Sequence, residues 1–417
     1  MSSVSSVAIP DDLRSLTPEW VTAALRQRGH LLNARVVDLK LENVGCGRMG
    51  AIARVMLTFE GDPGDVPSSL IAKLPTDVNE NRIFGEISGM YWREILFYEE
   101  LRNEVPVRTP ALFYSAMSVK VPPGDRMRQV ARIADWFPQK VLERFLALRK
   151  RQAVVQRPRY MLLMEDMMPA RAGDLRTDGT LEICDQVLRS IATLHAAFWK
   201  SPRLSEVRWL NGLAINPRMR HRMYMGAREK FVQHHQKLLT PEDLAVLEWI
   251  DRNGPSLSRI FDRDAPETVI HCDLRFDNIL FDRVRNEPVA FIDWQLAAIG
   301  PAAFDVAYFL SAALDTSVSQ EQELALLHAY HQTLLSSGVT GYPFELLVRD
   351  YRRGLVAVVQ VLCSSYSLDL GVGLEMDGFD RWVERAFGRL RGTPLVDLLS
   401  PSLRPPPLAH GTQRTHG

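Results

Sequence analysis

The segment from His271 to Trp294 constrains the fold more than any other part of the chain. It has the spacing His-x-Asp-x-x-x-x-Asn, from His271 through Asp273 to Asn278, and Asp293 follows fifteen residues after the Asn. Between Asn278 and Asp293 lie two short apolar runs separated by a polar turn, which is the pattern of a β-hairpin. The pattern predicts a loop followed by a hairpin, an arrangement that brings two carboxylates and one amide together.

These residue types suit phosphoryl transfer. Asp273 can accept the proton of an attacking hydroxyl, while Asn278 and Asp293 can hold Mg²⁺ on a nucleotide. A His-x-Asp motif alone is a weak signal, and the alternative is that Asp273 and Asp293 are a loop cap and a surface acid. The complete spacing, with the hairpin and the sequence Ile-Asp-Trp after it, favours the phosphotransferase interpretation.

A lysine in an apolar strand indicates where a nucleotide binds. The run from Leu70 to Leu74 is apolar except for Lys73, whose ammonium needs an anion if the strand is buried. The candidates are a nucleotide phosphate and Glu94, which lies in a helix predicted from Ile83 to Leu101. Alternatively, Lys73 faces solvent. Two other acids of the predicted helix are rival partners, Glu86 and Glu99.

A glycine-rich stretch, Gly45-x-Gly47-x-x-Gly50, precedes the lysine strand. It lies between two predicted strands rather than between a strand and a helix, which argues against a dinucleotide-binding Rossmann unit. The backbone N–H groups of such a loop can fold over phosphates. Gly45 and Gly47 are therefore candidate nucleotide contacts.

A further apolar strand, predicted over 160–164, leads into Glu165-Asp166-Met167. This segment is expected to connect two lobes, so that backbone groups near Glu165 and Met167 bind the edge of an adenine. An ordinary strand end followed by a turn is an equally good interpretation of the segment taken alone.

Composition limits the possible partners. The chain has 417 residues and a formal net charge of zero, so bulk charge gives no attraction to nucleic acid or membrane. Its longest apolar runs are too short to span a bilayer, and its start lacks the pattern of a signal peptide. Four widely separated cysteines indicate free thiols in a reducing compartment. We therefore expect a cytoplasmic protein, and the sequence does not indicate its oligomeric state.

Residues 117–158 form a basic insertion between two predicted strands. From Lys120 to Arg159 there are eleven Lys or Arg against three Asp or Glu, with an amphipathic helix predicted around 139–152. The insertion could be a lid, a wall of the substrate site, or a surface that contacts a protein or a membrane. With the basic segment 215–231, it favours a neutral or anionic acceptor over a polycation, unless these arginines form only a solvated surface.

The motifs together resemble the aminoglycoside phosphotransferase/choline kinase superfamily, especially its bacterial phosphotransferase and ecdysteroid-kinase-like branches. The resemblance covers roughly residues 15–395. It rests on the following segments: His271-Cys272-Asp273 with Asn278, Ile292-Asp293-Trp294-Gln295, Pro301 to Ala307, Leu194 to Trp199, and Met164-Glu165-Asp166. Asp-Trp in place of Asp-Phe-Gly points away from protein kinases.

The resemblance implies an α+β, bilobal, protein-kinase-like fold. Residues 1–164 would form a lobe with a small antiparallel sheet and a helix, and residues 165–400 a mostly helical lobe with the acceptor site. The tail, 401–417, is expected to be disordered because it is rich in proline and polar residues.

The resemblance also implies an ATP-dependent kinase that acts on a hydroxyl of a small molecule. Asp273 would be the base, Asn278 and Asp293 would bind Mg²⁺, and Lys73 would contact the phosphates while pairing with Glu94. His271 would orient the catalytic loop and Asp305 would hold it. The alternative is a non-catalytic, nucleotide-binding regulatory protein on the same fold.

Overall fold

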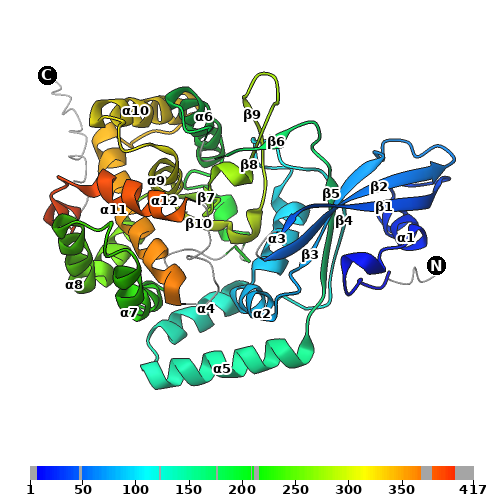
Figure 1. The fold of residues 1–417 in the computed structure, drawn as a ribbon, viewed down its shortest axis with the longest axis horizontal. Helices are drawn as coiled ribbons and strands as arrows, with labels where there is room; N and C mark the ends of the chain where they lie inside the picture. Colours follow the sequence, from blue (N-terminus) through cyan, green and yellow to red (C-terminus); the bar gives the residue numbers. More distant parts are fainter. Residues whose placement is uncertain are drawn as a thin grey trace, which may run out of the picture.

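The computed structural model describes residues 7–46, 49–121, 124–174, 177–207, 209–210, 216–367 and 378–399. The chain folds into two lobes, one built on a β-sheet and the other mostly helical (Figure 1). The predicted α+β, kinase-like architecture is therefore confirmed.

The smaller lobe contains a five-stranded antiparallel sheet in the order β1-β2-β3-β5-β4. Its strands are β1 (Arg35–Cys46), β2 (Gly50–Glu60), β3 (Ser69–Pro75), β4 (Leu112–Met117) and β5 (Tyr160–Glu165). Side chains alternate between the two faces of a strand. Leu70, Ala72 and Leu74 of β3 therefore join one hydrophobic core, while Lys73 faces the other side of the sheet.

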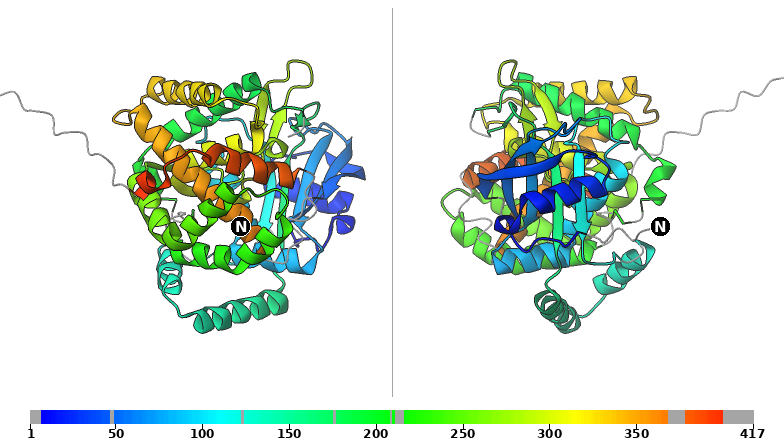
Figure 2. Two further views of the ribbon diagram at one scale, coloured as in Figure 1. Left: turned by 60° about the vertical axis from the view of Figure 1, so that its left-hand side comes forward. Right: turned by 90° about the vertical axis from the view of Figure 1, so that its right-hand side faces the viewer.

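The outer face of the sheet is covered by α1 (Pro18–Gln27) (Figure 2, right). Thr17 caps this helix, because its side chain accepts a hydrogen bond from the amide of Trp20, and Pro18 occupies the first turn. The buried side of α1 supplies Val21, Ala24 and Leu25 to the core of this lobe.

The single helix predicted from Ile83 to Leu101 is wrong. The chain forms α2 (Asn79–Ser88), α3 (Met90–Leu96) and a π-helical turn, η2 (Phe97–Leu101). Gly89 separates the first two with a left-handed backbone, φ 71°, and a Cβ there would lie 2.3 Å from the ring of Trp92. Glycine is thus required both by the backbone and by the close approach of the indole.

The basic insertion forms two helices, α4 (Gly124–Asp135) and α5 (Gln139–Gln156), along one edge of the molecule (Figures 1 and 2). The helix expected around 139–152 is confirmed, whereas α4 was not foreseen. α5 packs against α2 of the smaller lobe. α4 contacts the larger lobe, where Asp135 accepts a hydrogen bond from the amide of Met219 and the guanidinium of Arg218 lies 3.5 Å from the ring centre of Trp136.

The larger lobe consists mainly of helices packed around α9, whose twelve residues are all buried. Its helices are α6 (Leu181–Ala197), α7 (Pro217–His234), α8 (Pro241–Asp264), α9 (Ala302–Ala313), α10 (Gln320–Ser336), α11 (Phe344–Ser364) and α12 (Phe379–Leu390). No helix of the described residues is long and apolar enough to cross a membrane.

Two small sheets lie where the lobes meet. β7 (Glu267–Ile270) pairs with β10 (Ala298–Pro301), and β8 (Ile279–Phe281) lies between β6 (Arg171–Ala172) and β9 (Pro288–Phe291). The hairpin predicted after Asn278 is therefore confirmed as β8 and β9. It connects the loop after β7 to the acidic turn that follows β9.

Candidate active site

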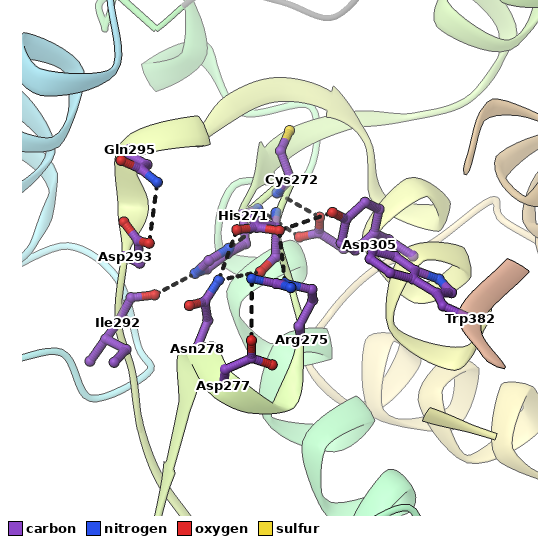
Figure 3. Close-up of polar contacts among 12 residues, drawn as sticks. His271, Cys272, Arg275, Asp277, Asn278, Ile292, Asp293, Gln295, Asp305 and Trp382 are labelled. Atoms are coloured by element: carbon purple, nitrogen blue, oxygen red, sulfur yellow. Dashed lines mark hydrogen bonds and ion pairs between the residues drawn. The ribbon is translucent and has the colours of Figure 1, made fainter. Parts of the chain in front are cut away.

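The loop after β7 is fixed by hydrogen bonds to one buried carboxylate. Asp305, in the first turn of α9, accepts hydrogen bonds from the amides of His271, at 2.6 Å, and Cys272, at 2.9 Å. Its side chain is fully buried and also lies 3.3 Å from Nε2 of His195. The predicted hydrogen bonds from Asp305 to the catalytic loop are present (Figure 3). They hold the loop while Cys272 adopts a left-handed backbone, φ 65°.

His271 links this loop to the end of the hairpin. Its Nε2 lies 2.9 Å from the carbonyl oxygen of Ile292, and its Nδ1 lies 3.3 Å from the amide of Asp273. Because the carbonyl can only accept and the amide can only donate, Nε2 carries the proton and Nδ1 accepts. The ring therefore fixes Asp273 relative to the segment that carries Asp293.

Asp273 presents a hydrogen-bonded carboxylate that solvent still reaches. Oδ1 accepts from the hydroxyl of Tyr308 at 2.9 Å and lies 3.2 Å from Nε of Arg275, while Oδ2 accepts from Nδ2 of Asn278 at 3.0 Å. Its side chain is 14% exposed. The carboxylate is thus oriented by its neighbours without being sealed off, as a general base requires.

Sequence reasoning missed Arg275 and Tyr308 as parts of this site. Burial opposes the charge of Arg275, but the carboxylates of Asp273 and Asp277 outweigh that cost and raise its pKa. Tyr308 lies one helical turn after Asp305 on α9, and residues three apart share a helix face. That spacing is the signal that could have identified Tyr308.

Lys73 joins the two lobes through two carboxylates. Its ammonium lies 2.7 Å from the carboxylate of Glu94 on α3 and 2.9 Å from Oδ1 of Asp293. Burial disfavours the charged amine, but the charges of Asp293 and Glu94 more than compensate and raise the pKa of Lys73. The helical partner of Lys73 is therefore Glu94 rather than Glu86 or Glu99. Burial raises the pKa of Glu94 despite the neighbouring ammonium.

Asp293 is held in place by the residues that follow it. Its backbone is left-handed, φ 64°, and Nε2 of Gln295 donates to its Oδ2 at 3.2 Å. Next to it, the fully buried Trp294 stacks on Phe97 with ring centres 4.1 Å apart and planes at 8°. The indole of the Ile-Asp-Trp motif thus packs against the first residue of η2, which directly follows the helix that carries Glu94.

Asn278 and Asp293 offer a suitable donor set for a magnesium ion. Nδ2 of Asn278 donates to the backbone oxygen of Asp273 at 2.8 Å as well as to its carboxylate, which leaves the amide oxygen for another partner. That oxygen turns to the side of the loop where Asp293 lies (Figure 3). Carboxylate and amide oxygens are the hard ligands that Mg²⁺ prefers, so these residues fit the ion.

The segment that connects the lobes is anchored by Asp166. Nε of Arg54 donates to its carboxylate at 2.5 Å, and Ser69 donates to it as well. Although burial acts in the opposite direction, these two donors lower the pKa of Asp166. The chain on either side of Asp166 is therefore held against β2 and β3.

The two candidate adenine contacts flank Asp166 and differ in availability. The amide of Glu165 donates to the carbonyl of Ala111 at 2.8 Å, so this N–H already has a partner. The carbonyl of Met167 accepts from the amide of Ala170, whereas the amide of Met167 has no hydrogen-bond partner among the described residues. Of these backbone groups, the Met167 N–H is the one left without a partner among the described residues.

The glycine-rich stretch is only partly described. Gly45 lies near the end of β1, and Gly47 lies outside the described residues. Gly50 begins β2, where a Cβ would lie 3.2 Å from Cε of Lys73. The small residue at this position leaves room for the lysine side chain.

Comparison with known proteins identifies the family. The model of the phosphotransferase enzyme family matches residues 116–343, which is more than half of the chain. The chain belongs to this family. The match includes the loop after β7, the hairpin and Asp293.

Individual relatives match this chain at low sequence identity or over a short segment. Acyl-CoA dehydrogenase family member 11 from Pongo abelii and from Homo sapiens is 36% identical over 75 residues, which are 18% of this chain and 9% of each relative. Among solved structures, choline kinase from Cryptosporidium parvum is similar over 90% of this chain and 94% of its own, with 12% identity and a TM-score of 0.49. Ethanolamine kinase from Plasmodium vivax is similar over 91% of this chain and 88% of its own, with 12% identity and a TM-score of 0.45.

Proposed function

We propose that this phosphotransferase transfers the γ-phosphate of ATP to a hydroxyl of a small molecule. Asp273 is the base, Asn278 and Asp293 are the Mg²⁺ ligands, and Lys73 contacts the phosphates. Gly45, Gly47, Glu165 and Met167 complete the proposed nucleotide contacts, with the amide of Met167 as the donor to adenine.

The contact of Lys73 with both Glu94 and Asp293 carries the proposal. The carboxylates of Glu94 and Asp293 lie 2.7 and 2.9 Å from the Lys73 ammonium. The contact with Asp293 connects the β-sheet lobe to the turn after the hairpin, across 220 residues of sequence. The pairing of a strand lysine with a helix glutamate, near an acid that binds metal, is the arrangement that phosphoryl transfer uses in kinases. A structural lysine needs only one of these partners.

The residues would act mainly by positioning and by charge. The hydroxyl oxygen of the acceptor forms a bond to the γ-phosphorus while the bond to the β–γ bridging oxygen breaks, and ADP leaves. Asp273 aligns the hydroxyl and accepts its proton, while Tyr308 and Asn278 keep the carboxylate oriented. Lys73 stabilises negative charge on the phosphates, and Asn278 and Asp293 would hold a Mg²⁺ ion that would supply further positive charge there.

The proposal is tested by incubating the protein with ATP, Mg²⁺ and pools of hydroxylated metabolites and by following ADP release and new phosphate esters by mass spectrometry. The expected result is a phosphate ester formed by the native protein and not by Asp273→Asn. ATP binding without any transfer would instead support a regulatory role. Transfer of equal rate by Asp273→Asn would contradict the assignment of the base.

A further inference from the structure

A cavity of about 310 Å³ lies between α2 and the end of α5, and none of its lining residues belongs to the catalytic centre. Its lining comes from both helices and from β5. One side of the cavity is lined by Arg82 and Glu86 of α2 and by Tyr91 of α3. The other side is lined by Val154 of α5, by Arg157 just after it, and by Tyr160 of β5. The volume suits a small metabolite rather than a nucleotide.

Two arginines, Arg82 and Arg157, line this cavity, and Glu86 is the one acidic residue that the structure describes in its lining. Burial and then repulsion from Arg157 lower the pKa of half-buried Arg82. Neither arginine forms an ion pair within 4.0 Å among the described residues. Glu86, the acid of the lining, accepts a hydrogen bond from the hydroxyl of Tyr160, and burial raises its pKa. The cavity therefore carries excess positive charge.

The amino end of α2 adds to this charge. Asn79, its first residue, lines the cavity, and no side chain caps the helix. Uncapped amides and the helix dipole favour an anion at such an end. The carboxyl end of α5 has the opposite dipole, but its carbonyl at Ala153 is engaged by the amide of Arg157. Its partial charge is smaller than that of two guanidinium groups.

One buried polar group of the cavity lacks a well-placed partner. The hydroxyl of Tyr91 is buried and makes no hydrogen bond of good geometry among the described residues, although the backbone of Thr76 lies near it. An unmet buried hydroxyl is costly, and a ligand oxygen would relieve it. The remaining walls include Ile83, Val154 and Pro158, which are apolar.

We infer that this cavity binds a phosphate monoester with a small apolar body. Arg82, Arg157 and the first amides of α2 would take the phosphate, and the apolar walls would take the body. The ligand would hold α5 of the insertion against α2.

The inference is tested with phenyl phosphate as the probe, in hydrogen–deuterium exchange and in calorimetric titration of the whole chain. The expected result is slower amide exchange in peptides covering 79–86 and 150–158, with weaker protection by inorganic phosphate and none by phenol. Arg157→Gln should weaken phenyl phosphate binding at least about tenfold, because a hydrogen bond to a charged group contributes about 1.5–3 kcal/mol. Arg151→Gln, on the same helix but outside the lining, is the matched control.

A further variant separates this cavity from the proposed nucleotide site. Asp293→Asn should bind phenyl phosphate as the native protein does, whether or not the kinase proposal holds. The inference is overturned if phenyl phosphate leaves exchange in both peptides unchanged. It is equally overturned if binding survives in Arg157→Gln or is lost in Asp293→Asn, because the probe would then occupy another site.

Discussion

Asp273 and Asp305 lie close together around one loop, yet their surroundings differ in kind. Asp305 is fully buried, and its partners on the loop are two backbone amides. Asp273 is 14% exposed, and its partners are the side chains of Tyr308, Asn278 and Arg275. A carboxylate that pairs with main-chain amides in a dry interior holds the chain. One that is oriented by side chains and open to solvent is available to a substrate.

The largest effect expected from this comparison is on turnover. Asp273→Asn should lower kcat by about 10²–10⁴-fold, since a positioned general base contributes that much. Its stability should change by less than about 1 kcal/mol, because the side chain is not sealed in the interior. Steady-state kinetics and urea unfolding measure the two quantities.

Asp277→Asn is the matched control for this variant. Asp277 lies in the same loop, but its side chain is 57% exposed and lies 3.3 Å from Nη2 of Arg275. Its kcat should fall by less than threefold or so, as exposed pairs contribute about 0–1 kcal/mol. Equal losses in both variants would mean that the charge of the loop, rather than the Asp273 carboxylate, matters.

Asp305→Asn should show the reverse pattern. The amide retains the shape, but its NH₂ group faces one of the two backbone N–H donors that the carboxylate now satisfies. The free energy of unfolding should fall by about 3–4 kcal/mol, because hydrogen bonds of buried groups to a charge are lost. Urea unfolding with an unchanged m-value would report this. A native midpoint together with lost turnover would place Asp305 in the chemistry instead.

A smaller effect concerns acid stability of the helical lobe. Burial lowers the pKa of His235 to about 4, although the Asp380 carboxylate acts in the opposite direction and His234 adds to the lowering. The unfolded value is about 6.5. The neutral ring is therefore favoured in the folded state, so this stability is complete above pH 6.5 and is lost as the pH falls toward 4. The loss should be about 2–3 kcal/mol.

Unfolding of the native protein and of His235→Gln between pH 7 and pH 4 measures this effect. The glutamine can still contact Tyr366, which hydrogen bonds to the histidine ring. The variant should lose the part of the pH dependence that arises in this window. An identical slope in both proteins would show that other groups cause it.

The smallest effect expected is that of Tyr308→Phe, which removes the hydroxyl that orients Asp273. Loss of one such hydrogen bond amounts to about 1 kcal/mol, or roughly fivefold in kcat. The KM for ATP should not change, because the Tyr308 hydroxyl hydrogen bonds to Asp273, the proposed base, and not to a residue proposed to bind the nucleotide. A higher KM for ATP at native kcat would contradict that role.

Much of this architecture could be predicted because it is encoded in local patterns. The apolar run around Lys73 predicted the strand, and the two apolar runs after Asn278 predicted the hairpin. The spacing between Asn278 and Asp293 required the two ends of that hairpin to meet. An ammonium in an apolar strand needs an anion, which made Glu94 a candidate beside Glu86 and Glu99, and the structure pairs Lys73 with Glu94.

Other features depend on tertiary packing that no local pattern shows. The interruption at Gly89 arises because the indole of Trp92 occupies the space of a Cβ, and a periodicity argument cannot detect that contact. Arg275 is visible in the motif, but its position between Asp273 and Asp277 depends on the folded loop. The docking of α4 on the larger lobe likewise depends on single contacts, such as that of Asp135 with Met219.

The most direct test of the central claim is a calorimetric titration of ATP, with and without Mg²⁺, into the native protein, Asp293→Asn and Asp273→Asn. If Asp293 holds the metal and Asp273 is the base, binding should depend on Mg²⁺ in the native protein, persist in Asp273→Asn and be strongly weakened in Asp293→Asn. ATP binding that is independent of Mg²⁺, or equal in Asp293→Asn and the native protein, would contradict the assigned site.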